Sequence, residues 1–293
     1  ARSRFPRGAG FAFLVRLASI PSIDCRSSIS SLISNALLPT TGVRHKPAGM
    51  IESIQNPSGD NIDYTFHEGA EGARDLLIIG HGVTGNKDRP FVVGLAEAVA
   101  AEGMPVLRFS FAGNGDSGGK FADCTISKEV DDLKAVVSAA HKQGYRITYA
   151  GHSMGGAVGV LAAAGDDRIS YLISLAGMVN TEAFYEREFG EETPDEGCMW
   201  EEPECPLSKV FMEDMMAIKT TAPKASSIQV PWLLIHGDVD DVVPIEDSRE
   251  IFALANEPKK MVEIPNANHV FSEDGLEPMS EAVISWIGDV LQG

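Results

Sequence analysis

The sequence has few cysteines, no long apolar run and a shortage of basic residues. Its 293 residues include four cysteines, too few for the disulfide framework of a small secreted protein. No stretch reaches the roughly 18 uninterrupted apolar residues of a transmembrane helix. Lys and Arg number 24 against 42 Asp and Glu, which gives a formal net charge of −18. This deficit of positive charge disfavours nucleic acids and anionic membrane surfaces as partners.

The basic residues that are present gather at the N-terminus. Residues 1–46 contain seven Lys and Arg against one acidic residue, and they are rich in Ser. This composition is typical of an organelle transit peptide, which implies an organellar location. A disordered extension, or translated sequence upstream of the true start, gives the same composition and leaves a cytoplasmic location. We therefore predict an N-terminal extension over residues 1–47 and a folded domain over residues 48–293.

Strand-like and helix-like segments alternate from about residue 49 onward. Hydrophobic residues make up 44% of the chain, which is ordinary for a globular protein and enough for a large core. The candidate strands are Met50–Ile54, Ile62–His67, Leu76–Ile79, Pro105–Phe109, Arg146–Ala150, Tyr171–Leu175, Trp232–Ile235 and Met261–Ile264. The candidate helices are Phe91–Ala101, Lys128–His141, Met154–Ala164, Ile245–Ala255 and Pro278–Leu291.

This alternation predicts an α/β fold. The runs 76–79 and 232–235 are continuously apolar, which is typical of strands buried on both faces of a parallel sheet. Strands that alternate with helices form βαβ units with right-handed crossovers. The first two candidate strands flank Pro57-Ser58-Gly59-Asp60, a hairpin signal. We expect one mostly parallel central sheet with helices on both faces, preceded by a hairpin.

About 50 residues interrupt the alternation between the strands that end near residue 176 and begin near residue 231. A structureless loop of this length is unusual in a compact domain, so we predict a small cap insertion at about residues 178–229. It contains twelve acidic against four basic residues, which either solvate its outer face or repel anionic substrates. Its Met and aromatic residues either pack together or wall an apolar substrate pocket; they are Phe184, Tyr185, Phe189, Met199, Trp200, Phe211, Met212, Met215 and Met216.

Two segments match the pattern Gly-x-Ser-x-Gly. The first, at residues 115–119, contains Ser117 and leads into a segment without helical character. The second, at residues 151–155, contains Ser153 between a candidate strand and a candidate helix. Strand, sharp turn and helix are the context of a nucleophile elbow, where the strained Ser needs small neighbours such as Gly151 and Gly155. We therefore predict Ser153 as the nucleophile and a Gly-rich loop around Ser117.

A nucleophilic Ser needs a base and an acid that orients the base. His269 follows the last candidate strand, which makes it the candidate base. Three residues that follow the strand ending at residue 235 are candidates for the acid that orients this base: Asp238, Asp240 and Asp241. The chain order Ser, Asp, His is that of the α/β-hydrolases.

Residues 50–293 resemble the α/β-hydrolases, in the group of serine aminopeptidase-like hydrolases, monoacylglycerol lipases and cinnamoyl or feruloyl esterases. The resemblance lies in His81–Gly85, Gly151–Gly156, Gly237–Pro244 and Asn268–Phe271. The family pattern Gly-x-x-Asp-x-x-Val-Pro implies that Asp240 is the acid. It also implies an oxyanion hole formed by the backbone N–H groups of Val83 and Met154. Many feruloyl esterases have an aromatic residue at the position of Val83, so this chain departs from them there.

We expect neither a metal nor a cofactor. His81, His152 and His236 each adjoin a Gly at a strand end, and the histidines show no metal-ligand spacing, so we interpret these three as structural. No Gly-x-Gly-x-x-Gly opens a helix after the first strand, which argues against a dinucleotide. Cys198 and Cys205 lack a CxxC pattern or paired His, and free thiols, a disulfide or a metal remain open for them.

The sequence therefore predicts a serine carboxylesterase-like hydrolase that acts on a small or medium neutral ester through an acyl-serine intermediate. Similar sites cleave thioesters, peptides and carbon–carbon bonds, so the fold does not separate these reactions. A non-enzymatic ligand receptor on the same fold is the alternative from another class. The expected partner is a small-molecule substrate.

Overall fold

The structure, a computed structural model, describes residue 51 and residues 53–292. The predicted extension over residues 1–47 lies outside these residues, as does part of the first candidate strand.

A seven-stranded sheet with the order β3-β5-β4-β6-β7-β8-β9 forms the centre of the described domain. Every neighbouring pair is parallel except β3 and β5. The mostly parallel α/β fold predicted from the sequence is thus confirmed. The strands are β3 (Tyr64–His67), β4 (Asp75–Gly80), β5 (Val106–Phe109), β6 (Arg146–His152), β7 (Ile169–Leu175), β8 (Trp232–Gly237) and β9 (Lys259–Ile264).

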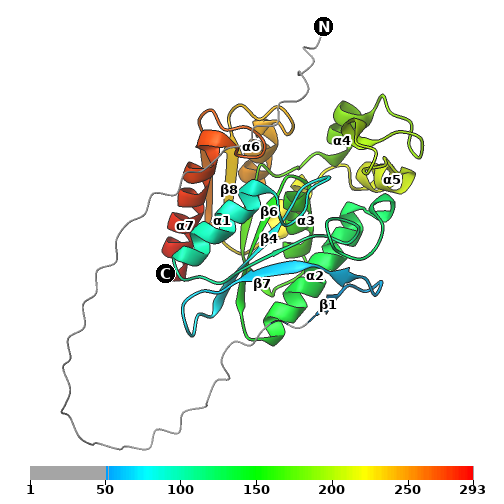
Figure 1. Cartoon of the computed structure of the whole chain (residues 1–293). Coiled ribbons are helices and arrows are strands. Elements are labelled where there is room, and N and C mark those ends of the chain that lie inside the picture. Colours follow the sequence, from blue (N-terminus) through cyan, green and yellow to red (C-terminus); the bar gives the residue numbers. More distant parts are fainter. Residues whose placement is uncertain (1–50, 52, 293) are drawn as a thin grey trace, which may run out of the picture. The chain divides into compact units, whose positions relative to one another are not determined.

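Helices cover both faces of this sheet (Figure 1). On one face α1 (Pro90–Ala101) lies beside α7 (Leu276–Gln292), and their apolar sides form a common core with the strands. On the other face α2 (Ile126–Lys142), α3 (Met154–Ala163) and α6 (Ile245–Leu254) contribute to a second core. The five predicted helices are confirmed, with ends shifted by at most two residues.

The predicted N-terminal hairpin is present, but its second strand is divided. Strands β1 (Ile54–Gln55) and β2 (Asn61–Ile62) pair with each other, whereas β3 joins the main sheet antiparallel to β5. The break falls at Asp63, whose N–H donates to the Ser117 hydroxyl at 2.8 Å and whose carbonyl accepts from the Ser110 N–H at 2.9 Å. The prediction of a single strand over residues 62–67 was therefore wrong. At residue 63 the two contacts with Ser117 and Ser110 replace the hydrogen bonds to a neighbouring strand.

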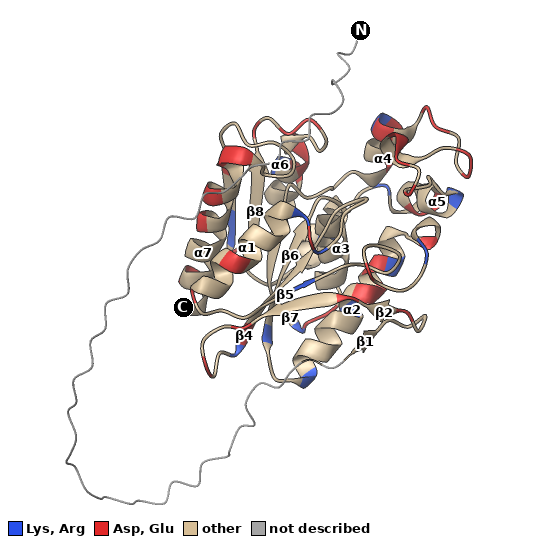
Figure 2. Cartoon of the chain, in the orientation of Figure 1, with Lys and Arg blue, Asp and Glu red and all other residues tan. Residues whose placement is uncertain are grey.

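The segment predicted as a cap insertion, residues 178–229, lies between β7 and β8 and is called the cap insertion below. It contains α4 (Thr181–Phe189), α5 (Lys209–Ile218) and the short 3₁₀ helices η2 (Met199–Glu201) and η3 (Ala222–Ser227). Phe189 lies at its centre, within 6.4 Å of the Phe211 ring and 4.9 Å of the Trp200 ring by their centroids. Acidic residues colour α4 and the loop that follows it (Figure 2). Two further 3₁₀ helices, η1 (Phe121–Asp123) and η4 (Glu273–Gly275), lie elsewhere in the domain.

In the described part of the chain, no helix combines the length and the apolar character needed to cross a bilayer.

Candidate active site

Ser153 lies in the sharp turn between β6 and α3. Its backbone has φ 52° and ψ −119°, a region that L-residues rarely occupy and that costs energy to maintain. The turn is tight, since a Cβ built on Gly151 would lie 2.1 Å from the Gly155 carbonyl oxygen, and one on Gly155 would lie 2.5 Å from that of His81. Only glycine fits at either position, as the nucleophile-elbow pattern predicts.

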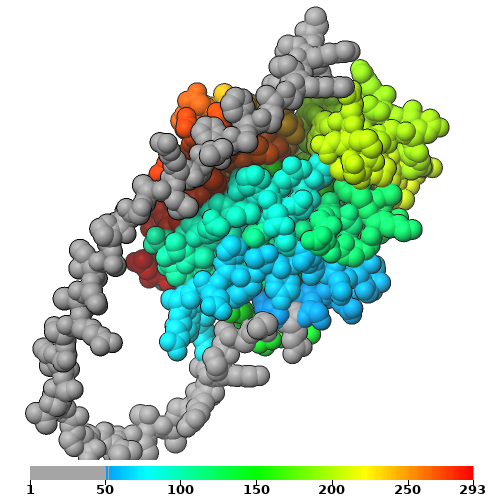
Figure 3. All heavy atoms as spheres, in the orientation of Figure 1, coloured from blue at the N-terminus to red at the C-terminus, as the bar shows by residue number. Residues whose placement is uncertain are grey.

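Ser153 opens onto a cavity of about 330 Å³. The cavity lies between the segment after β4, the elbow and the loop after β9, and the cap insertion reaches it with Trp200. Figure 3 shows the cap insertion in yellow-green beside the cyan segment that follows β4. The lining residues are His81, Gly82, Val83, Thr84, Gly85, Arg89, Phe91, His152, Ser153, Trp200, Val242, His269 and Val270.

His269 and Asp240 are joined by a hydrogen bond of 2.7 Å from Nδ1 to Oδ2. The Asp240 side chain is fully buried, and its other oxygen accepts from the N–H groups of Val242 and Val243, each at 2.9 Å. Burial alone raises the pKa of this carboxyl, but hydrogen bonds from His236 and His269 outweigh it and hold the pKa well below its usual range. Asp240 is therefore ionised at neutral pH and orients the imidazole of His269.

The two neighbouring carboxylates have other environments. Asp238 accepts from the Asn266 N–H at 2.6 Å, and its backbone N–H donates to the Ile264 carbonyl. It therefore fixes the loop before His269 without touching the imidazole. Asp241 is exposed. Among the three acids that the sequence left in competition, Asp240 is the one that contacts His269.

His236 supports Asp240 from the interior. Its Nε2 lies 3.1 Å from the Asp240 carboxylate and 2.9 Å from the Val243 carbonyl, while Nδ1 lies 2.7 Å from the Ser248 hydroxyl. The two acceptors on Nε2 place the ring proton there, so Nδ1 accepts from Ser248. This histidine is structural, as predicted, and it is completely buried.

The Ser153 hydroxyl makes no hydrogen bond to any residue within the described ranges, His269 included. Both residues line the same cavity. Catalytic hydrogen bonds are often long before substrate binds and tighten in the complex. The site thus holds a strained Ser, an imidazole and a buried carboxylate in one connected region.

The backbone N–H groups of Val83 and Met154 are the expected oxyanion hole, and the structure shows where both residues lie. Met154 is the first residue of α3, so its N–H has no intrahelical acceptor. The Val83 N–H has no acceptor in the part of the chain that the structure describes, and Val83 lines the cavity. A Cβ on the preceding Gly82 would lie 2.8 Å from that of Ser153. The segment after β4 therefore packs directly against the elbow.

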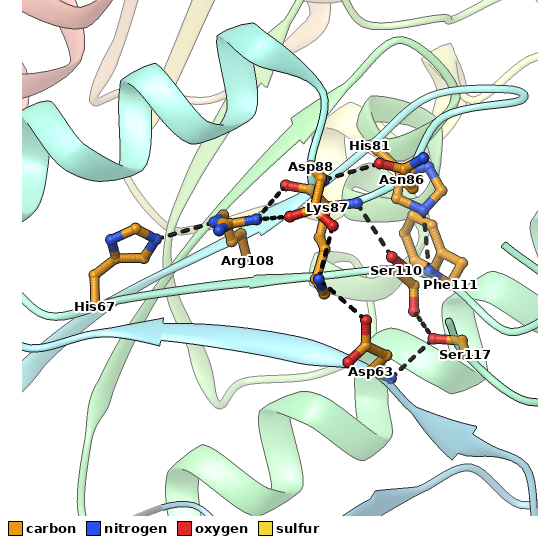
Figure 4. Close-up of polar contacts among 10 residues, drawn as sticks. All are labelled: Asp63, His67, His81, Asn86, Lys87, Asp88, Arg108, Ser110, Phe111 and Ser117. Carbon is orange, nitrogen blue, oxygen red and sulfur yellow. Dashed lines mark hydrogen bonds and ion pairs between the residues drawn. The ribbon is translucent and has the colours of Figure 1, made fainter. Parts of the chain in front are cut away.

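A buried polar network holds that segment in place (Figure 4). The Lys87 ammonium lies 3.2 Å from the Asp63 carboxylate and 2.8 Å from that of Asp88. The Lys87 N–H donates to the Ser110 hydroxyl, and its carbonyl accepts from Arg108. Because Lys87 is fixed through its side chain and both backbone groups, the backbone that carries Val83 is anchored to β5 and to the residue before β3.

Ser117, in the first Gly-x-Ser-x-Gly segment, belongs to the same network (Figure 4). Its hydroxyl donates to the Ser110 carbonyl at 2.7 Å and accepts from the Asp63 N–H at 2.8 Å. Ser117 does not line the cavity of Ser153. It therefore has a structural role at the point where β3 leaves the hairpin.

Two further histidines beside the cavity are held neutral. Burial lowers the pKa of His81 to about 4 and that of His152 to about 3, with His269 adding to the shift of His152. His81 accepts from the Phe111 N–H, and its other nitrogen faces the Gly82 carbonyl. His152 contacts the His269 carbonyl through Nε2 at 2.8 Å. These uncharged rings join the elbow, the segment after β4 and the loop of His269.

No group of three His, Cys, Asp or Glu within residues 53–292 has the arrangement of a metal site. Cys124, Cys198 and Cys205 are free thiols, which resolves the question that the sequence left open for the pair in the cap insertion. Burial raises the pKa of Cys205 to about 11, so this thiol is protonated and unreactive at neutral pH.

Two residues of the cavity wall, Arg89 and Phe91, lie outside every segment that the sequence linked to the site. Among the nine Met and aromatic residues of the cap insertion, Trp200 alone lines the cavity, and it is 39% exposed with φ 48°. Six of the others have exposed fractions of 4% or less and form the core of the insertion; they are Phe184, Tyr185, Phe189, Met199, Phe211 and Met215. Packing is thus the main role of this set. The periodicity of the sequence gave no signal that separates Trp200 from them.

The sheet topology is that of the α/β-hydrolase fold, and the family match and the structural neighbours given below show that the chain is a serine hydrolase of that fold. Residues 94–293 match the model of the prolyl oligopeptidase family, and the chain belongs to that family.

Similarity to individual proteins extends over most of the domain. The chain is 27% identical to the uncharacterised protein YfhR of Escherichia coli O157:H7 over 253 residues, covering 78% of this chain and 81% of that protein. The structure of Est1E from Butyrivibrio proteoclasticus with ferulic acid bound has a TM-score of 0.75 and 28% identity, over 83% of this chain and all of that one. Mouse alpha/beta hydrolase domain-containing protein 10 has a TM-score of 0.66 and 17% identity, covering 83% and 99%, which shows the shared fold.

Proposed function

We propose that the protein hydrolyses carboxylic esters through an acyl-Ser153 intermediate. One observation carries the proposal: a Ser in strained elbow geometry shares a cavity with His269, which is hydrogen-bonded to the buried, ionised Asp240. A neutral imidazole oriented in this way can accept the Ser proton. Its Nδ1 is occupied by Asp240, so Nε2 is the nitrogen that exchanges protons with Ser153 and substrate.

The reaction proceeds in two steps. Ser153 Oγ attacks the ester carbonyl while His269 takes its proton, and the N–H groups of Val83 and Met154 stabilise the oxyanion. His269 then returns the proton to the leaving alcohol. In the second step His269 activates water, which attacks the acyl-enzyme and releases the acid and Ser153.

The substrate that we propose is a small or medium neutral ester. The cavity of about 330 Å³ is lined mainly by apolar and backbone atoms, which suits an apolar acyl group. The cap insertion above it contributes Trp200 and a strongly acidic outer surface, so that it serves as a cap that disfavours anionic esters. The bound ferulic acid of the similar Est1E supports an ester substrate, whereas Val83 differs from the aromatic residue of many feruloyl esterases.

Peptide hydrolysis is the second candidate, because the family whose model matches residues 94–293 is named for an oligopeptidase. A panel of p-nitrophenyl esters of increasing acyl length, a cinnamate, a thioester and an aminoacyl amide separates these reactions. We expect a pre-steady-state burst and an acyl adduct on Ser153 with the esters. Turnover of the amide with none of the esters would replace the ester proposal. No adduct and no turnover with any of them would favour a ligand receptor.

A further inference from the structure

A second cavity adjoins the one that contains Ser153. It measures about 260 Å³ and shares three residues, Arg89, Phe91 and Val270, with the first. The rest of its wall comes from the start of α1, the loop after His269 and the start of α7: Pro90, Phe271, Ser272, Glu273 and Leu276. The two cavities are therefore neighbours that share part of one wall.

The position of this second cavity relative to His269 decides what it can hold. In ester cleavage the leaving oxygen must receive its proton from the imidazole, so the alcohol lies on the His269 side of the carbonyl carbon. Val270 and Phe271 follow His269 directly and wall the second cavity. Val83 and Trp200 line the first cavity but not the second. The acyl group thus belongs beside Ser153, and the alcohol points toward Val270.

Its lining also suits an apolar group. Its apolar lining residues are Phe91, Val270, Phe271 and Leu276, and its two charged lining residues, Arg89 and Glu273, have opposite signs. Val270 is 43% exposed, so an apolar group bound here would remove apolar surface from water. An apolar cavity of about 150 Å³ holds a benzene molecule, so this space accepts a phenyl ring or an alkyl chain of similar size.

From this geometry we infer that the second cavity is the alcohol subsite, and that it selects esters of uncharged aryl-alkyl or alkyl alcohols. The inference rests on the proposed ester hydrolysis. It assigns specificity for the leaving group to Leu276, Val270 and Phe91.

The test uses acetate esters of ethanol, butanol, hexanol and benzyl alcohol. All four give the same acetyl-enzyme, so the subsite changes acylation, measured as kcat/KM, and leaves the deacylation rate constant common to the series. We expect kcat/KM to rise about three- to fourfold for each methylene group buried. A matched series of ethyl esters with growing acyl chains separates this effect from filling of the first cavity.

Two substitutions at one position change the size of the subsite in opposite directions. Leu276→Phe should lower the ratio of kcat/KM for benzyl acetate to that for ethyl acetate by about tenfold, and Leu276→Ala should shift preference toward bulkier alcohols. Leu254→Phe is the matched control, because Leu254 is a helical leucine that is 50% exposed and lines neither cavity. Thermal unfolding of each variant checks that it folds.

The outcomes separate the two proposals. The alcohol subsite is overturned if kcat/KM does not change with the length of the alcohol while an acyl-Ser153 adduct still forms. It is also overturned if the Leu276 variants show the same ratio of kcat/KM for benzyl and ethyl acetate as the Leu254 control. Absence of that adduct with every ester overturns the proposed function itself.

Discussion

The carboxyl edge of the central sheet and the cap insertion both border the catalytic cavity, but they are built differently. At the sheet edge, neighbouring parallel strands set the positions of the proposed catalytic residues: Gly80 pairs with Gly151, His152 with Leu175, and Gly237 with Ile264. The cap insertion contains an aromatic cluster that belongs to the same apolar core as α2 and α3, and it reaches the cavity with Trp200.

Because the two regions are built differently, we expect substitutions in them to change activity by different amounts. A residue at the sheet edge is fixed by backbone pairing and by buried polar contacts, so its replacement removes a group that nothing else can supply. The cap insertion acts through a single exposed side chain and through long-range charge. We therefore expect substitutions at the edge to abolish chemistry and substitutions in the insertion to adjust substrate preference.

The largest effect expected is that of Ser153→Ala. Loss of the nucleophile should lower kcat by about 10⁴- to 10⁶-fold, and further loss of His269 should add little because the two act as a unit. Ser117→Ala is the matched control, since Ser117 occupies the other Gly-x-Ser-x-Gly segment and contacts Asp63 and Ser110. Steady-state rates with p-nitrophenyl acetate measure both. An inactive Ser117→Ala with an active Ser153→Ala would reverse the assignment.

Next in size is the acid that orients His269. Asp240→Asn should lower kcat by about 10²- to 10⁴-fold, because an amide cannot hold the imidazole in the same tautomer and charge state. Asp238→Asn and Asp241→Asn make the same chemical change within two residues of Asp240, at side chains that do not contact His269. Each should lower kcat by less than tenfold. Equal losses in the three variants would show that the loop as a whole, and not the Asp240 carboxylate, matters.

The buried histidines should make the sheet edge sensitive to acid. Their pKa values of about 4 for His81 and about 3 for His152 lie below the unfolded value of about 6.5. The unfolded chain therefore binds more protons, and the stability that these rings contribute is present above pH 6.5 and is lost as the pH falls toward 4. Lowering the pH from 7 to 5 should therefore reduce the free energy of unfolding by about 2 kcal/mol for each of the two rings.

Urea unfolding of the wild type and of His152→Gln at both pH values tests this effect. Gln keeps an N–H that can reach the His269 carbonyl but does not titrate, so the variant should lose about 2 kcal/mol less than the wild type. The comparison cancels groups common to both proteins, such as buried Glu129, whose raised pKa acts in the opposite direction. An unchanged pH dependence in the variant would contradict the low pKa of His152.

The smallest effect concerns the cap insertion. With matched neutral and carboxylated esters, kcat/KM should favour the neutral ester by a few fold at low salt, and the gap should shrink as salt screens the acidic surface. Arg89 lines the cavity and opposes this repulsion, so Arg89→Gln should widen the gap. Equal kcat/KM values for the neutral and the carboxylated ester at low salt would show that the acidic residues do not affect substrate choice.

Local patterns in the sequence were sufficient for the parallel strands, the five helices that cover the sheet and the residues of the elbow, but they did not predict α4 and α5 in the cap insertion. Continuous apolar runs indicate buried parallel strands. The tight turn of Gly-x-Ser-x-Gly between a strand and a helix requires small residues beside the Ser, and the sequence shows residue size directly. The division of the predicted strand at residue 63 had no such signal, because it depends on Ser117, which is 54 positions away.

The sequence alone determined the fold class, the glycines at the elbow and the set of residues that could form a triad, since these follow from periodicity, size and chain order. Tertiary structure decided the rest. It placed Asp240, and neither of its two neighbours, against His269. It put Trp200 both against Phe189 and in the cavity wall, and it set a second cavity beside the first, with Phe91 and Val270 lining both. The physical reason is that hydrogen-bond partners and cavity walls come from segments far apart in the chain, whose approach is set by packing of the whole core.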